Sequence, residues 1–452
     1  MRRNPGLSDA PERLLGRRMS LLLAAGMLSG CSYLSNFFSA EKKPIAGKRE
    51  EALVVRHGLE PPKGTRPRVV LPPPVLNAAW PEAGGNPAHL MGHLQLAAVP
   101  KPAFLVKIGE GGGYRKKIVT QPVVFENRIY TMDSEALVRA FNASTGAQFW
   151  SFDTRRKDDL SANVGGGLCT FEGVLYATTG RGDLVALEAA SGKLLWRKNL
   201  ELPIRASPTV ADGRLFVITI DQKLYALAAV NGRELWNHQA APALTSVLSA
   251  PGPAYAAGFL FAGFGSGDIL AFNAMTGDII WSDSIPALGG RENEVAISAI
   301  SGMPVTDGER VIVIGQGGLL IADDLHTGRR IWEKEVGGGQ TPWVAGEWVF
   351  FVTLDQRAAA VNAQTAEVAW VTQLPQYADT KKRKNPITWY GPVLAGDRLV
   401  FAGTNGQALS VSPYSGEILG DEKLPAPAAV APIVANQMLY FVLDDGRLLA
   451  LQ

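Results

Sequence analysis

The chain has 452 residues, of which 46% are hydrophobic, 49 are Gly and 29 are Pro, which is typical of a turn-rich globular protein and excludes a disordered chain. The small net charge of +2 comes from basic residues in the first hundred positions, so residues 101–452 are mildly acidic. This charge distribution argues against a nucleic-acid partner.

The N-terminal segment has the pattern of an export signal. Arg13, Arg17 and Arg18 precede an apolar run from Leu21 to Leu28, which is too short to span a bilayer stably, and "LSGC" then ends at Cys31. This tetrad resembles a bacterial lipobox, in which the Cys thiol is lipidated and becomes the mature N-terminus. We therefore predict a lipoprotein signal peptide over residues 1–30 and lipidation of Cys31; the alternative is an ordinary signal peptide with an incidental Cys. Ser32 follows in place of Asp, which by the Gram-negative sorting pattern implies the outer membrane.

Residues 31–100 are rich in Pro, Ala and charged residues and have no hydrophobic periodicity. This composition predicts a lipidated N-terminus followed by a disordered tether of extended polyproline character. Truncation of the tether up to Val99 is then expected to leave stability intact. The stretch "HLMGH", from His89 to His93, has the spacing of metal ligands, but it lacks a carboxylate or Cys companion, so a metal site is disfavoured.

A repeat of roughly 45 residues begins after residue 101. Each unit contains short apolar stretches typical of four strands, and three positions recur: a small residue, then a Gly, then a Trp four residues after that Gly. The Trp position is occupied by Trp150, Trp196, Trp236, Trp281, Trp332, Trp370 and, in the next unit, Gly420. The Gly position is occupied by Gly146, Gly192, Gly232, Gly277, Gly328 and Gly416, with Ala366 as the exception. This pattern predicts an all-β fold, an eight-bladed β-propeller of four-stranded blades over residues 101–452.

Two details of the blades follow from the same pattern. The pair Asn231-Gly232 predicts a two-residue hairpin of type I′ before the outermost strand, because both central residues of that turn need a positive φ. The small residue and the Trp are expected to pack one blade against the next. The last unit ends before its outermost strand, so we predict that residues 102–109 supply the fourth strand of blade eight and close the ring.

The Ala-Leu, Thr/Ser-Gly and Trp elements resemble the pyrroloquinoline-quinone-type propeller repeat. Together with the lipobox and eight blades, the chain resembles the BamB family of the outer-membrane β-barrel assembly machinery, and the stretch Ala78–Ala97 resembles the segment before the propeller in alphaproteobacterial members. The resemblance implies a noncatalytic scaffold lipoprotein without a cofactor, anchored by lipid at the periplasmic face of the outer membrane. It also implies docking on the periplasmic domains of the central barrel-inserting subunit, to assist folding and insertion of nascent outer-membrane proteins.

Two other functions share this architecture. A quinoprotein dehydrogenase needs a quinone over a Trp, a calcium ion held by carboxylate and amide oxygens, an Asp base and usually a vicinal Cys pair, whereas Cys169 stands alone here. The second alternative is a propeller that binds peptidoglycan or another envelope ligand.

Partner contacts are expected in the connectors His238–Ser249 and Ser282–Gly302, which match by position the family's loops that contact the barrel-inserting subunit. The family's charged residues in these loops are replaced here, so the match is positional only. The residues concerned are Leu244, Ser246, Val247, Leu248, Arg291, Glu292, Glu294, Ala299, Ile300 and Ser301. The basic run Lys381–Lys384 is interpreted as a solvated loop, with contact to anionic lipid or an acidic partner as the alternative, and nearby Trp389 is a candidate contact.

Overall fold

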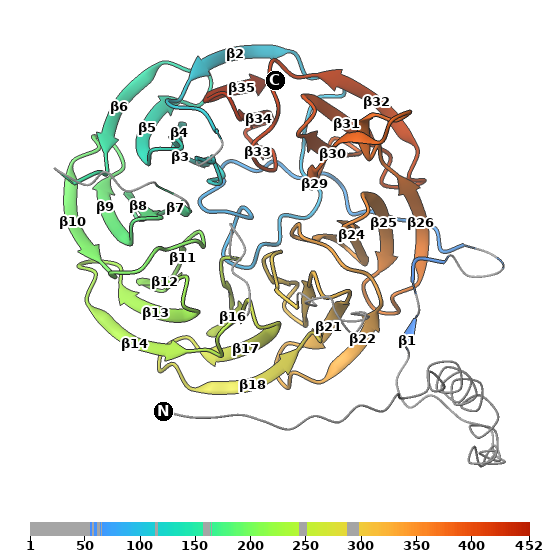
Figure 1. Ribbon diagram of the computed structural model, residues 1–452, viewed down its shortest axis with the longest axis horizontal. Coiled ribbons are helices and arrows are strands. Elements are labelled where there is room, and N and C mark those ends of the chain that lie inside the picture. Colours follow the sequence, from blue (N-terminus) through green and yellow to red (C-terminus); the bar gives the residue numbers. More distant parts are fainter. Residues whose placement is uncertain are drawn as a thin grey trace, which may run out of the picture. The chain divides into compact units, whose positions relative to one another are not determined.

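The computed structural model describes residues 55–56, 58–60, 64, 66–113, 116–156, 163, 165–243, 251–286 and 298–452. Within these ranges the chain forms eight radial β-sheets around a central axis (Figure 1), which confirms the eight-bladed propeller. No helix among the described residues is long and apolar enough to cross a membrane.

The first four blades follow one another in the sequence, and each runs from an innermost to an outermost strand. Blade 1 contains β3 (Val123–Phe125), β4 (Arg128–Met132), β5 (Leu137–Asn142) and β6 (Gln148–Asp153). Blade 2 contains β7 (Gly166–Phe171), β8 (Val174–Thr179), β9 (Asp183–Glu188) and β10 (Leu194–Asn199). Blade 3 contains β11 (Thr209–Ala211), β12 (Arg214–Ile218), β13 (Lys223–Ala228) and β14 (Glu234–Gln239). Blade 4 contains β15 (Ala254–Ala256), β16 (Phe259–Gly263), β17 (Asp268–Asn273) and β18 (Ile279–Ser284).

The other four blades complete the ring. Blade 5 contains β19 (Val305–Thr306), β20 (Arg310–Ile314), β21 (Leu320–Asp324) and β22 (Arg330–Lys334), and β1 (Val55–Arg56) pairs in parallel with β22 as a fifth strand. Blade 6 contains β23 (Trp343–Ala345), β24 (Trp348–Val352), β25 (Arg357–Asn362) and β26 (Val368–Gln373). Blade 7 contains β29 (Trp389–Ala395), β30 (Arg398–Gly403), β31 (Gln407–Val411) and β32 (Ile418–Lys423), and a separate hairpin of β27 (Tyr377–Asp379) and β28 (Lys384–Pro386) precedes it. Blade 8 contains β33 (Ile433–Ala435), β34 (Met438–Leu443), β35 (Arg447–Leu451) and, from the other end of the chain, β2 (Pro102–Lys107).

The predicted type I′ turn is at a different hairpin from the one expected. Of Asn231 and Gly232, only the glycine has a positive φ, of 69°, and the strand register shifts beside it, so this hairpin is a longer loop with a bulge. The two positive φ angles occur instead at Asp212 (49°) and Gly213 (68°), where two residues join β11 to β12. The prediction for Asn231-Gly232 was wrong because the Ala228 amide donates to the Arg233 carbonyl at 2.8 Å, which leaves four residues in the loop in place of two.

The recurring Trp joins each blade to the next. In blade 3, Trp236 lies opposite the small Ala226 and donates a hydrogen bond from its Nε1 to the Ala274 carbonyl of blade 4, at 3.1 Å. Gly277 of blade 4 has a φ of 81°, and a Cβ added there would lie 2.7 Å from the Trp236 ring. Glycine therefore serves both the left-handed backbone and the close approach of the indole. The same donor bond to the following blade is made by Trp150, Trp196, Trp281, Trp332 and Trp370.

The ring closes through β2, which pairs antiparallel with β35, as predicted. In this strand Phe104 lies opposite the small Ala450 and packs near Gly146 of blade 1, so a phenylalanine takes the Trp position of blade 8. Blade 8 has no hairpin into its outermost strand, because that strand comes from the N-terminal side of the chain. The Trp position of blade 7 therefore has no neighbouring hairpin to contact, and Gly420 there has no atom within 4 Å of an added Cβ.

The predicted tether is corrected for residues 66–100. Within this range, residues 77–96 pack inside the ring, where the blue ribbon follows the inner strands in Figure 1, and Trp80 and Leu94 are each only 1% exposed, whereas Val70, Val75, Leu76 and Val99 are more than half exposed. Residues 75–95, here called the hub segment, close on themselves: the Val75 amide donates to the His93 carbonyl and the Gln95 amide to the Val75 carbonyl, both at 2.9 Å. The folded unit therefore begins well before residue 101, and truncation to Val99 is not expected to be neutral.

The hub segment contacts all eight blades in circular order. Its partners lie in or next to the innermost strands and run from blade 8 through blades 1 to 7. They are, in that order, Asn77 with Val434 and Asn436, Trp80 with Val124, Pro81 with Thr170, Glu82 with Val210, Pro87 with Tyr255, Ala88 with Thr306, Gly92 with Trp343, and Leu94 with Leu394 and Gly396. Most of these bonds use the main chain of the hub segment, so its path is fixed by backbone pairing more than by side-chain packing.

Candidate functional site

A cavity of about 660 Å³ lies on the propeller axis above the hub segment. Trp80, Gly84 and His89 of the hub segment form its floor. Its walls are formed mainly by residues that precede the innermost strands, such as Gln121 before β3 and Gln340 before β23. The hub segment thus closes one end of the axis, and the cavity lies toward the end where the connectors between blades arrive.

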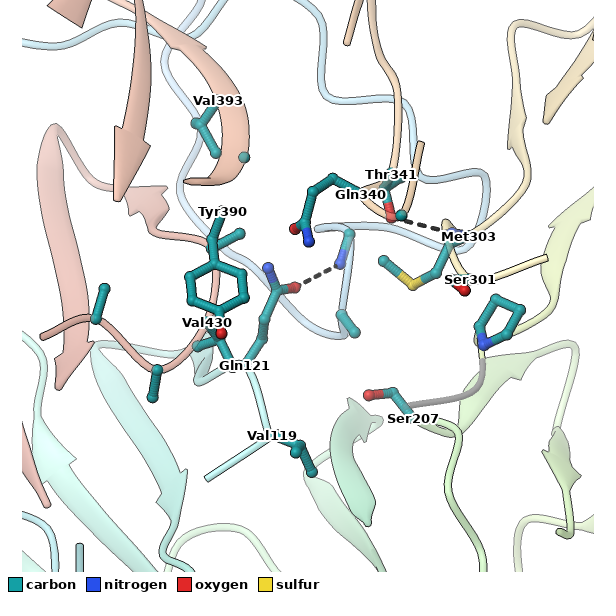
Figure 2. A pocket seen from close by; sticks show the side chains of 18 of the residues that line it. Val119, Gln121, Ser207, Ser301, Met303, Gln340, Thr341, Tyr390, Val393 and Val430 are labelled. Carbon is teal, nitrogen blue, oxygen red and sulfur yellow. Dashed lines mark hydrogen bonds between the residues drawn. The ribbon is translucent and has the colours of Figure 1, made fainter. Parts of the chain in front are cut away.

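Neutral polar side chains from several blades converge on this cavity. Figure 2 shows Gln121 and Gln340 projecting into it, with Ser207 and Tyr390 on other sides. Some groups are held in place: the Gly84 amide donates to Gln121 Oε1 at 3.0 Å, and the Met303 amide donates to the Thr341 hydroxyl at 3.0 Å. No motif in the sequence reveals these residues, because each belongs to a short loop whose neighbours in space come from other blades.

A buried carboxyl links the hub segment to blades 2 and 3. Glu82 is 1% exposed, its main chain bridges to Cys169 and its Oε2 accepts a hydrogen bond from the Val210 amide at 3.1 Å. Burial raises the pKa of Glu82 to about 8, against the opposing effect of the Val210 N–H, so the carboxyl is largely protonated at neutral pH. Cys169 is a core residue, and burial raises the pKa of its thiol, so it has little nucleophilic character.

The two histidines of "HLMGH" have structural roles. His89 Nδ1 lies 2.6 Å from the Pro304 carbonyl and His93 Nδ1 lies 2.8 Å from the Pro72 carbonyl. Because a carbonyl only accepts, both Nδ1 atoms carry a proton and donate. Burial lowers the pKa of His89 to about 4, so this ring is neutral at physiological pH.

The requirements of a quinone enzyme are not matched by the cavity lining. Among the described lining residues Asp444 is the one carboxylate, whereas a calcium site and an Asp base need several. The described residues also contain no cluster of three or more His, Cys, Asp or Glu that could hold a metal ion. Trp80 stacks on Trp343 at a centroid distance of 6.3 Å, so these two indoles are engaged with each other.

Most of the predicted partner contacts lie outside the described residues. These are Leu244, Ser246, Val247, Leu248, Arg291, Glu292 and Glu294. The two connectors nevertheless lead directly into the cavity wall. Pro251 and Gly252 shortly after the first connector line the cavity, as do Ser301 at the end of the second connector and Met303 just after it.

The prediction that Ile300 and Ala299 contact a partner is corrected by their burial. Both are 0% exposed, and Ile300 bridges to Gly315 and packs in the core between blades 4 and 5. An apolar residue after a charged connector was interpreted as an exposed anchor, but a β-bridge turns it inward. Ser301 is half-buried and accepts a hydrogen bond from Gln316 Nε2 at 2.5 Å, so it belongs to the cavity wall.

Trp389 is also not a contact residue. It lies in β29 with 0% exposure and donates from its Nε1 to the Pro375 carbonyl at 2.8 Å. The basic run Lys381–Lys384 is exposed and spans the turn between β27 and β28, which agrees with a solvated loop.

Comparison with known proteins identifies the family. The family described as "Outer membrane protein assembly factor BamB" matches residues 134–372, more than half of the chain. The BamB of Moranella endobia is 23% identical over 346 residues, which cover 75% of this chain and 86% of that protein.

Solved structures share the fold. The crystal structure of BamB from Moraxella catarrhalis covers 78% of this chain and 100% of its own, with a TM-score of 0.66 and 19% identity. A quinohemoprotein alcohol dehydrogenase from Comamonas testosteroni has a TM-score of 0.63 at 14% identity, with 82% of this chain and 80% of that chain covered, which shows the common propeller alone. The matching family and the relative from Moranella endobia are named as assembly factors, which supports the prediction that this chain is not an enzyme. The chain belongs to the BamB family of outer-membrane protein assembly factors.

Proposed function

We propose that this protein is a lipid-anchored, noncatalytic scaffold that docks on the periplasmic domains of the barrel-inserting subunit and assists the assembly of nascent outer-membrane proteins. The observation that supports it most is family membership over more than half of the chain, since the family model and relatives such as the BamB of Moranella endobia carry the name of an assembly factor. A propeller held rigid by the Trp contacts between blades and by the hub segment provides a fixed platform for docking loops.

The proposed docking surface is the face on which the connectors leave the outermost strands. The connectors between blades 3 and 4 and between blades 4 and 5 are long, and they combine the apolar residues Leu244, Val247 and Leu248 with the charged residues Arg291, Glu292 and Glu294. Apolar anchors inside a charged rim are typical of moderate, reversible interfaces. Ile300 and Ala299 are left out of this surface because they are core residues.

Docking is tested with a double substitution, Leu244→Asp with Leu248→Asp. The variant is expected to lose co-purification with the barrel-inserting subunit while its melting temperature stays within a few degrees of the wild type. The matched control is Leu195→Asp on β10, a leucine that is 49% exposed and lies away from the connectors, and it is expected to retain the partner. Retained binding by the double variant, or equal loss in the control, contradicts the proposed surface.

Attachment to the outer membrane is proposed through Cys31. A diacylglyceryl group together with an amide-linked chain meets the two-signal requirement for stable anchoring. The anchor would place the propeller in the periplasm, within reach of the machinery on which it is proposed to dock.

A further inference from the structure

We infer that the axial cavity is a binding site for a small neutral saccharide. The inference concerns the cavity above the hub segment and is independent of docking on the assembly machinery. Its volume of about 660 Å³ falls within the range of roughly 300–1,000 Å³ that is usual for small-molecule sites.

The polar groups of the lining act both as donors and as acceptors. Carboxamides come from Gln121, Gln316 and Gln340, and hydroxyls come from Ser207, Ser301, Thr341, Tyr390 and Thr404. A carboxamide and a hydroxyl can each donate and accept, as can every hydroxyl of a sugar. The lining therefore matches a ligand that carries many such groups close together.

Charged groups are few and balanced among the described lining residues. The described lining contains one acidic residue, Asp444, and one basic residue, Lys117, and His89 is kept neutral by burial, which lowers its pKa to about 4. No arginine is among the described lining residues. Moving a phosphate or carboxylate from water into the cavity costs hydration energy, and one lysine among the described lining residues offsets little of that cost, so a neutral ligand is favoured.

The cavity wall offers both preorganised and unused polar groups. Gln121 is oriented by the Gly84 amide and Gln316 by Ser301, which leaves Gln121 Nε2 and Gln316 Oε1 for a ligand. Within the described residues, the side chains of Gln340 and Tyr390 make no hydrogen bond. Groups already held in place lose little entropy on binding, and unused ones gain a partner.

The shape of the cavity favours a compact ligand over a polypeptide chain. The hub segment closes the axis at one end, so an extended chain cannot pass through, and the innermost strands already use main-chain groups on the hub segment. The apolar part of the lining, including Met303 and Val430, can contact the C–H faces of a sugar ring. A mono- or disaccharide combines these requirements.

The test uses the purified protein and saturation-transfer difference NMR with maltose, cellobiose and N,N′-diacetylchitobiose. At least one of these sugars is expected to bind saturably, with a Kd below about 10 mM. Glucuronic acid serves as the anionic probe and triglycine amide as the peptide probe. The inference would be overturned if none of the three sugars bound saturably, whether or not glucuronic acid or triglycine amide bound.

Variants locate the site. Gln340→Ala is expected to weaken binding at least tenfold and Tyr390→Phe severalfold, whereas Gln148→Ala, an exposed glutamine on β6, is expected to leave the Kd unchanged. Gln340 has no hydrogen bond to lose within the described residues, so the melting temperature of its variant should match the wild type. Unchanged affinity in both cavity variants, or equal weakening in Gln148→Ala, overturns the assignment.

Discussion

Glu82→Gln is expected to remove a large part of the pH dependence of stability. The folded-state pKa of Glu82 is about 8, raised by burial from a value of 4.5, so the folded protein holds a proton that the unfolded chain releases above pH 4.5. The stabilisation from this proton is fully present below pH 4.5 and is lost as the pH rises toward 8. Each pH unit in that window costs about 1.4 kcal/mol, which gives a total on the order of 5 kcal/mol.

The glutamine variant keeps an oxygen that accepts from the Val210 amide but carries no titratable proton. Urea unfolding of both proteins at pH 5, 6, 7 and 8 should show the difference in free energy of unfolding, variant minus wild type, increasing with pH by about 1 kcal/mol per unit. His89 and Asp323, whose pKa values are also shifted by burial, titrate in both proteins, so the difference isolates Glu82. The control is Glu417→Gln at an exposed position, for which a parallel profile is expected. Parallel profiles for Glu82→Gln and the wild type would refute the linkage.

Three further predictions test the hub segment, the contacts between blades and the anchor. Deletion of residues 1–99 is expected to lower the free energy of unfolding in urea by at least about 3–5 kcal/mol relative to deletion of residues 1–65, because the loss of buried Trp80 alone costs that much. Equal unfolding midpoints of the two proteins would show that the hub segment does not contribute to stability. Gly277→Ala should cost about 1–3 kcal/mol in the same assay, because a φ of 81° strains an alanine and its Cβ meets the Trp236 ring, and a neutral effect would contradict the packing role of this glycine. Cys31→Ala should move the protein from the membrane fraction to the soluble periplasm, measured by fractionation and mass spectrometry of the N-terminus; a variant that stays membrane-bound would count against the lipid anchor.

The propeller could be predicted from the sequence because its contacts repeat. A Trp that must meet a Gly of the next blade imposes the same spacing on every unit, and the missing outermost strand of the last unit pointed to β2. Phe104 in the Trp position of blade 8 was missed, since it stands alone at the far end of the chain from its unit.

The hub segment and the cavity could not be predicted in the same way. The partners of the hub segment are main-chain groups of seven blades and the Trp343 indole of blade 6, and hydrogen bonds to the main chain leave no side-chain pattern. The Pro-rich, aperiodic composition of residues 66–100 is shared by tethers and by irregular packed segments. Ile300 was misplaced for a related reason, because its burial depends on an isolated bridge to Gly315 that periodicity does not show.

The contacts of the hub segment with all eight blades have a consequence for the folding of the chain during synthesis. Asn77 bonds to Val434, 357 residues later, so the earliest folded residues meet one of their partners only when synthesis is almost complete. Contacts of such sequence separation form slowly, because the closure of a long loop costs entropy before the contact offsets it. A prematurely terminated chain would leave both the hub segment and β2 without their final partners, exposing apolar surface and an open strand edge. The contacts between the two ends of the chain that stabilise the complete propeller are therefore missing from an incomplete chain, which is then prone to aggregation or degradation.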